Sequence, residues 1–230
     1  MQRLAGAAVL LLALLAPAAA RALPPPGYGA GPGYCARYGE TASRLSFDGV
    51  YACAHVASYG PTPFDADGRE SFQCVELVAR FLWAVHGVWA GPGTGVLDGA
   101  GLVAAVHRRY PAIARAFPEP GSVPAAGDVV SLGPGGAVDP RYGHTAIVVR
   151  ADARRGTFRV IGQNFPPGSA GEQTLRVDLR GGHDGRVLLN GAWTAASWLA
   201  LVRQPPAAGG GGGRVSPGSP PPRRAPSDHA

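Results

Sequence analysis

Apolar residues recur at helical spacing in one stretch of the chain. They lie three or four residues apart, at Val75, Val78, Leu82 and Val85. This spacing places them on one face of an α-helix, and Glu76 and Arg80 form a favourable i,i+4 pair on it. Gly87 suits the position just after the end of a helix. The pattern therefore predicts a helix that begins at Cys74 and ends at Gly87.

Short apolar runs separated by turn residues fill the second half of the chain, which is typical of strands. The predicted strands are 128–132, 144–150, 157–163, 175–179 and 197–202. A second helix is expected within 99–117, interrupted near Pro111 because proline breaks the helical hydrogen-bond pattern. Helices followed by an antiparallel meander predict an α+β domain.

The two ends of the chain differ in composition from its middle. Residues 1–22 hold Arg3, a charge-free apolar run and a series of small residues that ends at Ala22, which is the pattern of a cleaved secretory signal peptide. A membrane anchor is the alternative, but the apolar run is too short to span a bilayer. Residues 23–33 are rich in proline and glycine and predict a linker. Residues 205–230 cannot bury apolar surface and predict a disordered tail.

One folded domain is therefore expected over 34–204, secreted to the periplasm or the cell exterior, with no integral membrane segment in the mature chain. The formal net charge of the whole chain is +6. Two positive charges are lost with residues 1–22, and the tail after Gln204 carries a net two more, so the folded part holds about +2. Because charge is not gathered in a central basic patch, we expect no nucleic-acid partner. We also expect a monomer.

The chain has three cysteines, Cys35, Cys53 and Cys74. An odd number in an exported protein indicates one disulfide and one free thiol. Cys35 and Cys53 are the expected pair, since this pairing leaves the helix-borne Cys74 free, and the bridge would stabilise the fold by about 3 kcal/mol. The alternative is that all three are small buried apolar residues.

Cys74 is the candidate nucleophile. At the start of a helix, the helix dipole and the unpaired N–H groups favour a thiolate over a thiol. The backbone N–H of Cys74 is also placed to stabilise an oxyanion. His144 is the candidate base, because it follows Gly143 and begins an apolar strand that has a partner strand beside it. A core cysteine packed like its valine neighbours is the alternative for Cys74.

The register of the hairpin that His144 begins decides which residue faces the imidazole. A five-residue loop over 152–156 places His144 opposite Asn164, whose amide would then accept from the imidazole and fix its tautomer. A four-residue loop places His144 opposite Gln163 instead. The five-residue loop is the register we expect, with Asn164 as the third residue of the site.

At these positions the sequence resembles the CHAP family of cysteine- and histidine-dependent amidohydrolases and peptidases. The resemblance is carried by four segments within about residues 45–203, namely 73–76, 127–130, 143–148 and 163–164. It implies a papain-like α+β fold, with N-terminal helices packed on an antiparallel β-sheet. It also implies that Cys74 is the nucleophile and His144 the general base. The family often has glutamate where this chain has Gly162, which leaves the third group open between Asn164 and Gln163.

The resemblance implies hydrolysis of amide bonds in peptidoglycan peptides, so the sequence predicts a secreted thiol-dependent amidase or endopeptidase that forms a thioacyl-enzyme. A γ-glutamyl or polyamine amide is the alternative substrate, and a non-catalytic cell-wall-binding module on the same fold is the alternative function. Asp65 and Asp67, with Glu76 downstream, are spaced as in some calcium loops. Arg69 would place a positive charge inside such a site, so we expect no metal and no cofactor.

Overall fold

The computed structural model describes residues 23–25, 27–38, 40–54, 62–64, 73–117, 122–165, 170–183 and 185–201. The expected signal peptide over 1–22, the expected tail over 205–230 and the acidic residues Asp65 and Asp67 lie outside these described residues. The helices are α1 Gly33–Arg37, α2 Cys74–His86 and α3 Leu102–Arg109. The strands are β1 Thr41–Phe47, β2 Val50–Ala54, β3 Ala114–Phe117, β4 Val129–Leu132, β5 His144–Asp152, β6 Thr157–Gln163, β7 Ala170–Val177, β8 Arg186–Leu189 and β9 Ala192–Leu201. Each helix in these ranges is too short or too polar to cross a membrane.

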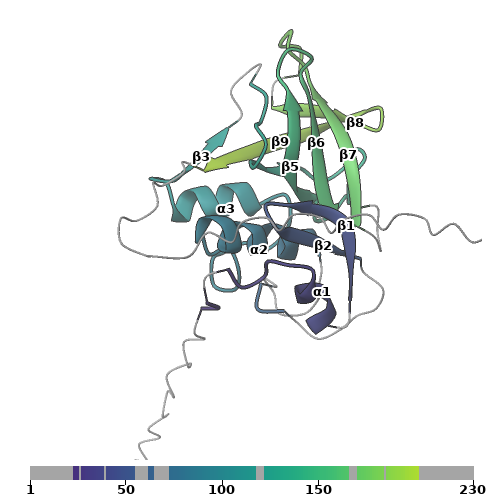
Figure 1. Ribbon diagram of the computed structural model, residues 1–230. Helices are drawn as coiled ribbons and strands as arrows, with labels where there is room; N and C mark the ends of the chain where they lie inside the picture. Colours follow the sequence, from purple (N-terminus) through teal and green to yellow (C-terminus); the bar gives the residue numbers. More distant parts are fainter. Residues whose placement is uncertain are drawn as a thin grey trace, which may run out of the picture.

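Seven strands form one antiparallel sheet in the order β3-β9-β4-β5-β6-β7-β8, and β8 also pairs with β9. The strands from β4 to β9 therefore form a closed ring of pairings, to which β3 is attached along β9. β9 closes the ring because residues 192–195 pair with β8 and residues 196–199 pair with β4. A separate two-stranded sheet joins β1 and β2. In Figure 1 the helices α2 and α3 lie across one end of the strand ring, and the β1–β2 pair lies beside α2.

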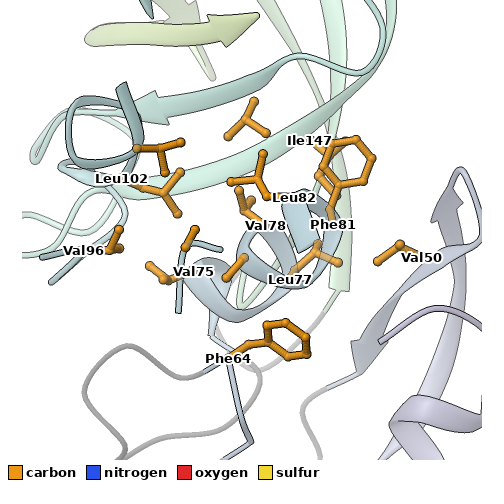
Figure 2. Packing of buried hydrophobic residues seen from close by; sticks show 14 of the residues in the cluster. Val50, Phe64, Val75, Leu77, Val78, Phe81, Leu82, Val96, Leu102 and Ile147 are labelled. Carbon is orange, nitrogen blue, oxygen red and sulfur yellow. The ribbon is translucent and has the colours of Figure 1, made fainter. Parts of the chain in front are cut away.

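Alternate residues of β5 face two different apolar clusters. Ala146 and Val148 belong to the cluster of buried residues contributed by the ring strands β4 to β9. Ile147 belongs to the second cluster, in which the sheet packs against the helices. Figure 2 shows Ile147 beside Phe81 and Leu82 of α2. Burial of both faces is what fixes β5 against α2, and both candidate residues of the site lie at this contact.

The helix prediction is confirmed at its start and, to within one residue, at its end. α2 begins at Cys74 and ends at His86, and Gly87 follows in the left-handed conformation, with φ of 67°. The predicted pair on this helix is also present, since Arg80 Nε lies 2.9 Å from Glu76 Oε1. Both of these side chains are 0% exposed. Charged side chains are almost never buried so fully unless they are paired.

Other elements differ from their predictions in extent. The predicted strands at 144–150 and 157–163 are present as β5 and β6, but β1, β2, β3 and β8 lie where no strand was predicted. β3 and β8 have only four residues each, and β1 has no fully buried position. The apolar alternation that would predict a strand is therefore weak in β1, β3 and β8. α3 ends at Arg109, before the proline that was expected to interrupt it.

The segment that was expected to be a linker contacts the folded domain. Trp83 Nε1 donates to the Pro25 carbonyl at 3.2 Å, and Arg80 Nη1 donates to the Gly29 carbonyl at 3.1 Å. Gly29 has a φ of 102°, and a Cβ at this position would collide with the Arg80 side chain. Residues 23–33 therefore contribute contacts to the buried Glu76–Arg80 ion pair.

The predicted disulfide joins Cys35 of α1 to Cys53 of β2, with a Cα–Cα distance of 5.5 Å. Both cysteines are fully buried. Cys74 is a free cysteine, as the pairing argument predicted. The bridge connects the N-terminal helix to the small sheet that lies beside α2.

Candidate active site

Cys74 is the first residue of α2, and its sulfur lies against the beginning of β5. The preceding residue, Gln73, is extended, with φ −75° and ψ 169°, so the chain turns into the helix at the cysteine. The backbone N–H groups of Thr145, Val75 and Cys74 itself lie near enough to the sulfur to lower the pKa of the thiol. Because Thr145 directly follows His144, these contacts place the sulfur beside the peptide group that links His144 to β5.

His144 is held at the start of β5 by two close backbone approaches. Gly143 has a φ of 62°, and a Cβ there would collide with the Leu132 carbonyl. A Cβ at Gly99 would lie 2.8 Å from the His144 Cα. Glycine is therefore required at both positions for the chain to pass so close to His144. The sequence predicts the close backbone approach at Gly143, whereas the approach at Gly99 joins distant segments and was not predicted.

The imidazole of His144 is buried against an aromatic ring. One face of the imidazole ring is covered by the Phe165 ring, with ring centroids 4.1 Å apart and planes inclined by 29°. His144 is 4% exposed and Phe165 is 7% exposed. The Nε2 atom of His144 is buried and has no hydrogen-bond partner within the described part of the chain.

Burial keeps both candidate residues in their neutral forms. Burial raises the pKa of the Cys74 thiol to about 11, although the three N–H donors oppose this shift. Burial also lowers the pKa of His144 to about 3. The prediction that the helix N-terminus would favour a thiolate is therefore wrong for the free protein, since desolvation outweighs the N–H groups. Both pKa shifts therefore favour the uncharged forms near neutral pH, a thiol at Cys74 and a neutral imidazole at His144.

A pH dependence of stability follows from the buried imidazole. The pKa of His144 is about 3 in the folded protein against 6.5 for an ordinary histidine. Between these values the unfolded chain binds a proton that the folded chain does not, so acidification favours unfolding in this interval. We expect the free energy of unfolding to fall with acidification by a few kcal/mol more for the wild type than for His144→Gln. Urea denaturation across this interval measures the difference, and parallel curves for the two proteins would contradict it.

The length of the hairpin loop differs from the prediction, but the residue that comes level with His144 does not. The loop has four residues, because Asp152 pairs with Thr157. A bulge between Val148 and Arg150 then shifts the register by one residue, and Val148 pairs with Val160. Continued toward the start of β5, this register brings His144 level with Asn164. The five-residue loop was wrong, and the extra residue lies in the strand instead.

Gln163 lies on the opposite side of β6 from the imidazole. Its Oε1 accepts from the Cys53 N–H at 2.7 Å and from Arg80 at 2.9 Å. Its Nε2 donates to Glu76 at 2.9 Å and to the Gln73 carbonyl at 3.2 Å. Gln163 is fully buried, so it connects β2, β6 and α2 behind the nucleophile.

Asn164 lies on the side of the site and contacts the residue before the nucleophile. Its Nδ2 donates to Gln73 Oε1 at 2.6 Å. Its backbone is left-handed, with φ of 55°, which asparagine adopts more readily than most residues. The structure therefore brings Asn164 to Gln73, and in the described part of the chain His144 Nε2 has no hydrogen bond to Asn164. The Gln73 side chain, Phe165 and the Thr145 N–H are parts of the site that sequence reasoning missed.

Gln163→Ala and Asn164→Ala are expected to have different effects. Removing the Gln163 amide leaves buried donors and acceptors unsatisfied, which costs about 3 kcal/mol of stability. Removing the Asn164 amide releases Gln73 at the site, so we expect the rate per folded molecule to fall about tenfold with little loss of stability. Thermal denaturation and rates on a soluble peptide amide, measured on the same samples, separate the two effects. Equal losses of rate per folded molecule in both variants would contradict the assignment of Asn164.

The described residues contain no group of three or more His, Cys, Asp or Glu side chains that could hold a metal ion. Glu76, which had been considered as a calcium ligand, has both carboxylate oxygens bound to Arg80. Asp65 and Asp67 lie outside the described residues.

The segment that contains these residues matches a known family of domains. The family model of the CHAP domain matches residues 64–164, which include Cys74, His144 and Asn164. Residues 64–164 are therefore similar to a CHAP domain. Comparison with curated proteins gives no match.

Solved structures are also similar to this chain at low identity, and two of them are described here. One is an N-acetylmuramoyl-L-alanine amidase from Staphylococcus aureus, with 15% identity and a TM-score of 0.37, covering 70% of this chain and 38% of the amidase. The other is Ly7917 with the hydrolyzing product of MDP, with 16% identity and a TM-score of 0.37, covering 64% of this chain and 58% of Ly7917. The chain therefore spans less than two thirds of the length of either protein.

Proposed function

We propose that this CHAP-like domain hydrolyses amide bonds in peptidoglycan peptides, with Cys74 as nucleophile and His144 as general base. The observation that carries the proposal is the position of the one free cysteine of the described residues, at the start of α2 and against the His144–Thr145 peptide. Residues 64–164 match the CHAP domain, and the resemblance to that family implies hydrolysis of amide bonds. Cys74 begins α2 and His144 begins β5 later in the chain, which is the chain order that a papain-like hydrolase needs.

The neutral resting pair defines the first step. As the Cys74 sulfur attacks the substrate carbonyl carbon, its proton passes to the His144 imidazole, and the carbonyl oxygen becomes an oxyanion. The Cys74 N–H is the proposed donor to this oxyanion, and the Gln73 amide is held beside it by Asn164. Collapse of the intermediate breaks the C–N bond, and the imidazolium gives its proton to the departing amine.

The second step releases the thioacyl-enzyme. His144 takes a proton from a water molecule, whose oxygen attacks the thioester carbonyl. The carbon–sulfur bond breaks, the proton returns to sulfur, and the product leaves as a carboxylic acid. Asn164 is the third residue of this proposal, and its role is to hold Gln73 and to turn the chain after β6.

Secretion is part of the proposal. It rests on the signal-peptide pattern over 1–22 and on the Cys35–Cys53 disulfide, since such bridges persist in oxidising compartments. A peptidoglycan substrate lies outside the cytoplasmic membrane, in agreement with export.

Digestion of purified peptidoglycan tests the function. Mass spectrometry of the released fragments, before and after labelling of new amino groups, identifies the bond that is cut. The matched control is the same protein alkylated at Cys74 with iodoacetamide, which removes the nucleophile and leaves the chain otherwise intact. New amine and carboxylate ends that form only in the untreated sample support a thiol-dependent amidase. Binding to the wall material with no new ends in either sample would indicate a non-catalytic module instead.

A further inference from the structure

The imidazole of His144 lacks the hydrogen bond that usually fixes the orientation of a catalytic histidine. Its Nε2 is buried and has no partner in the described ranges. The Gln163 amide lies on the other side of β6, and the Asn164 Nδ2 donates to Gln73. Something other than a side-chain hydrogen bond at Nε2 must therefore hold the ring.

The strand next to His144 leaves no room at position 162 for a side chain that could make such a hydrogen bond. A Cβ at Gly162 would lie 2.6 Å from His144 Nε2 and 3.3 Å from its Cε1. Contacts under about 3 Å between carbon and nitrogen are repulsive, so any side chain at this position would displace the ring. In this chain the imidazole lies directly over the Gly162 backbone.

Phe165 covers the imidazole with its own ring. The centroid distance of 4.1 Å and the inclination of 29° describe a stacked pair. Phe165 is itself fixed, because it is 7% exposed and belongs to the apolar cluster of the ring strands. The left-handed backbone of Asn164, with φ of 55°, turns the chain directly after β6 and before Phe165.

We propose that Phe165 is a positioning residue for the reaction: its ring and the Gly162 backbone hold the His144 imidazole by packing, in place of a hydrogen-bonded carboxylate. The expected effect on the rate rests on the proposed function. The position of the imidazole rests on the geometry alone. Packing restricts rotation of the ring about its Cβ–Cγ bond, and it leaves Nδ1 as the ring nitrogen that exchanges a proton with Cys74.

Kinetics of Phe165 variants test the role in the reaction. Phe165→Leu is expected to lower kcat on a soluble peptide amide by about ten- to a hundredfold with little change in KM, because a small misplacement of the base weakens proton transfer. Phe165→Tyr keeps a stacked ring and should restore most of the rate. The matched control is Phe158→Leu, which removes a ring that is 1% exposed in the same cluster. Its kcat per folded molecule should stay near that of the wild type. Equal losses in the two leucine variants would show a general packing effect and overturn the proposal.

The Gly162→Glu variant separates packing from hydrogen bonding. If packing holds the ring, the new side chain displaces it and the rate falls by at least about tenfold. If the site lacks only a carboxylate, the rate rises, and the proposal is wrong. Gly162→Ala should also lose rate, since the Cβ alone meets Nε2.

An NMR titration tests the geometry without any activity. The His144 ring signals, assigned by comparison with His144→Gln, should titrate far below the ordinary range in the wild type. They should move back toward that range in Phe165→Ala, because the ring is then exposed. An unchanged titration in Phe165→Ala would overturn the inference even in an active enzyme. A changed titration in a protein that hydrolyses no amide would leave the geometry standing and reject the proposed function.

Discussion

Replacing Cys74 by serine is expected to lower amide hydrolysis by at least about a thousandfold, with little change in melting temperature. The hydroxyl has nearly the volume of the thiol and accepts hydrogen bonds, so the N–H groups of Thr145 and Val75 keep an acceptor. The alcohol is a much weaker nucleophile than the thiol when the base is a neutral imidazole with a depressed pKa. Loss of a nucleophile in a site that acts as a unit costs about as much as loss of the whole unit.

The measurement is the rate on peptidoglycan and on a soluble peptide amide, with far-ultraviolet circular dichroism to show that the variant is folded. Cys53 cannot serve as a control, because it forms the disulfide. His144→Gln is the informative companion, since it removes the base and leaves the thiol. Turnover by the folded Cys74→Ser protein at a tenth of the wild-type rate or more would reject Cys74 as the nucleophile.

Replacing Glu76 by alanine is expected to destabilise the protein by about 3–5 kcal/mol. Removal of one partner of a fully buried ion pair leaves the other charge uncompensated. The Arg80 guanidinium would keep its bonds to the Gly29 carbonyl and to Gln163, and it would keep the Tyr34 ring, whose centroid lies 4.4 Å from Cζ. These partners carry no negative charge, so they offset only part of the loss.

A surface ion pair in the same protein supplies the control. Arg159 pairs with Glu172, and the two side chains are 47% and 28% exposed. Glu172→Ala should therefore cost about 1 kcal/mol or less. Urea denaturation of both variants gives the comparison. A double variant, Glu76→Leu with Arg80→Met, should recover much of the loss, because it removes both charges together. If Glu76→Ala were no more destabilising than Glu172→Ala, the buried pair would not be a major stabilising feature.

The features that sequence predicted well are those with a strong local signal. α2 has an apolar face, an internal ion pair and a glycine after its last turn, and all three point to one helix. β6 has the predicted bounds of Thr157–Gln163, because its apolar run is bounded by turn residues. The disulfide followed from the count of cysteines and from the need for one free thiol.

Features that depend on contacts between distant segments were not predictable in this way. The bulge in β5 after Val148 has no sequence signature, yet it decides the register at His144. The stack of Phe165 on the imidazole depends on a left-handed turn at Asn164. The raised pKa of Cys74 reflects burial by the assembled domain, whereas the sequence showed only the favourable helix N-terminus. In each case the tertiary environment outweighs the local preference.

The contact between Gly29 and Arg80 has a consequence for proteolytic maturation. Cleavage near Ala22, as proposed, leaves the Gly29 carbonyl on the mature chain as an acceptor for the buried guanidinium. Trimming by an extracellular protease beyond Gly29 would remove this acceptor and uncover a charge in the interior. The Gly29 carbonyl is thus part of the interior of the folded unit, and a recombinant fragment that begins at the first helix would lack it.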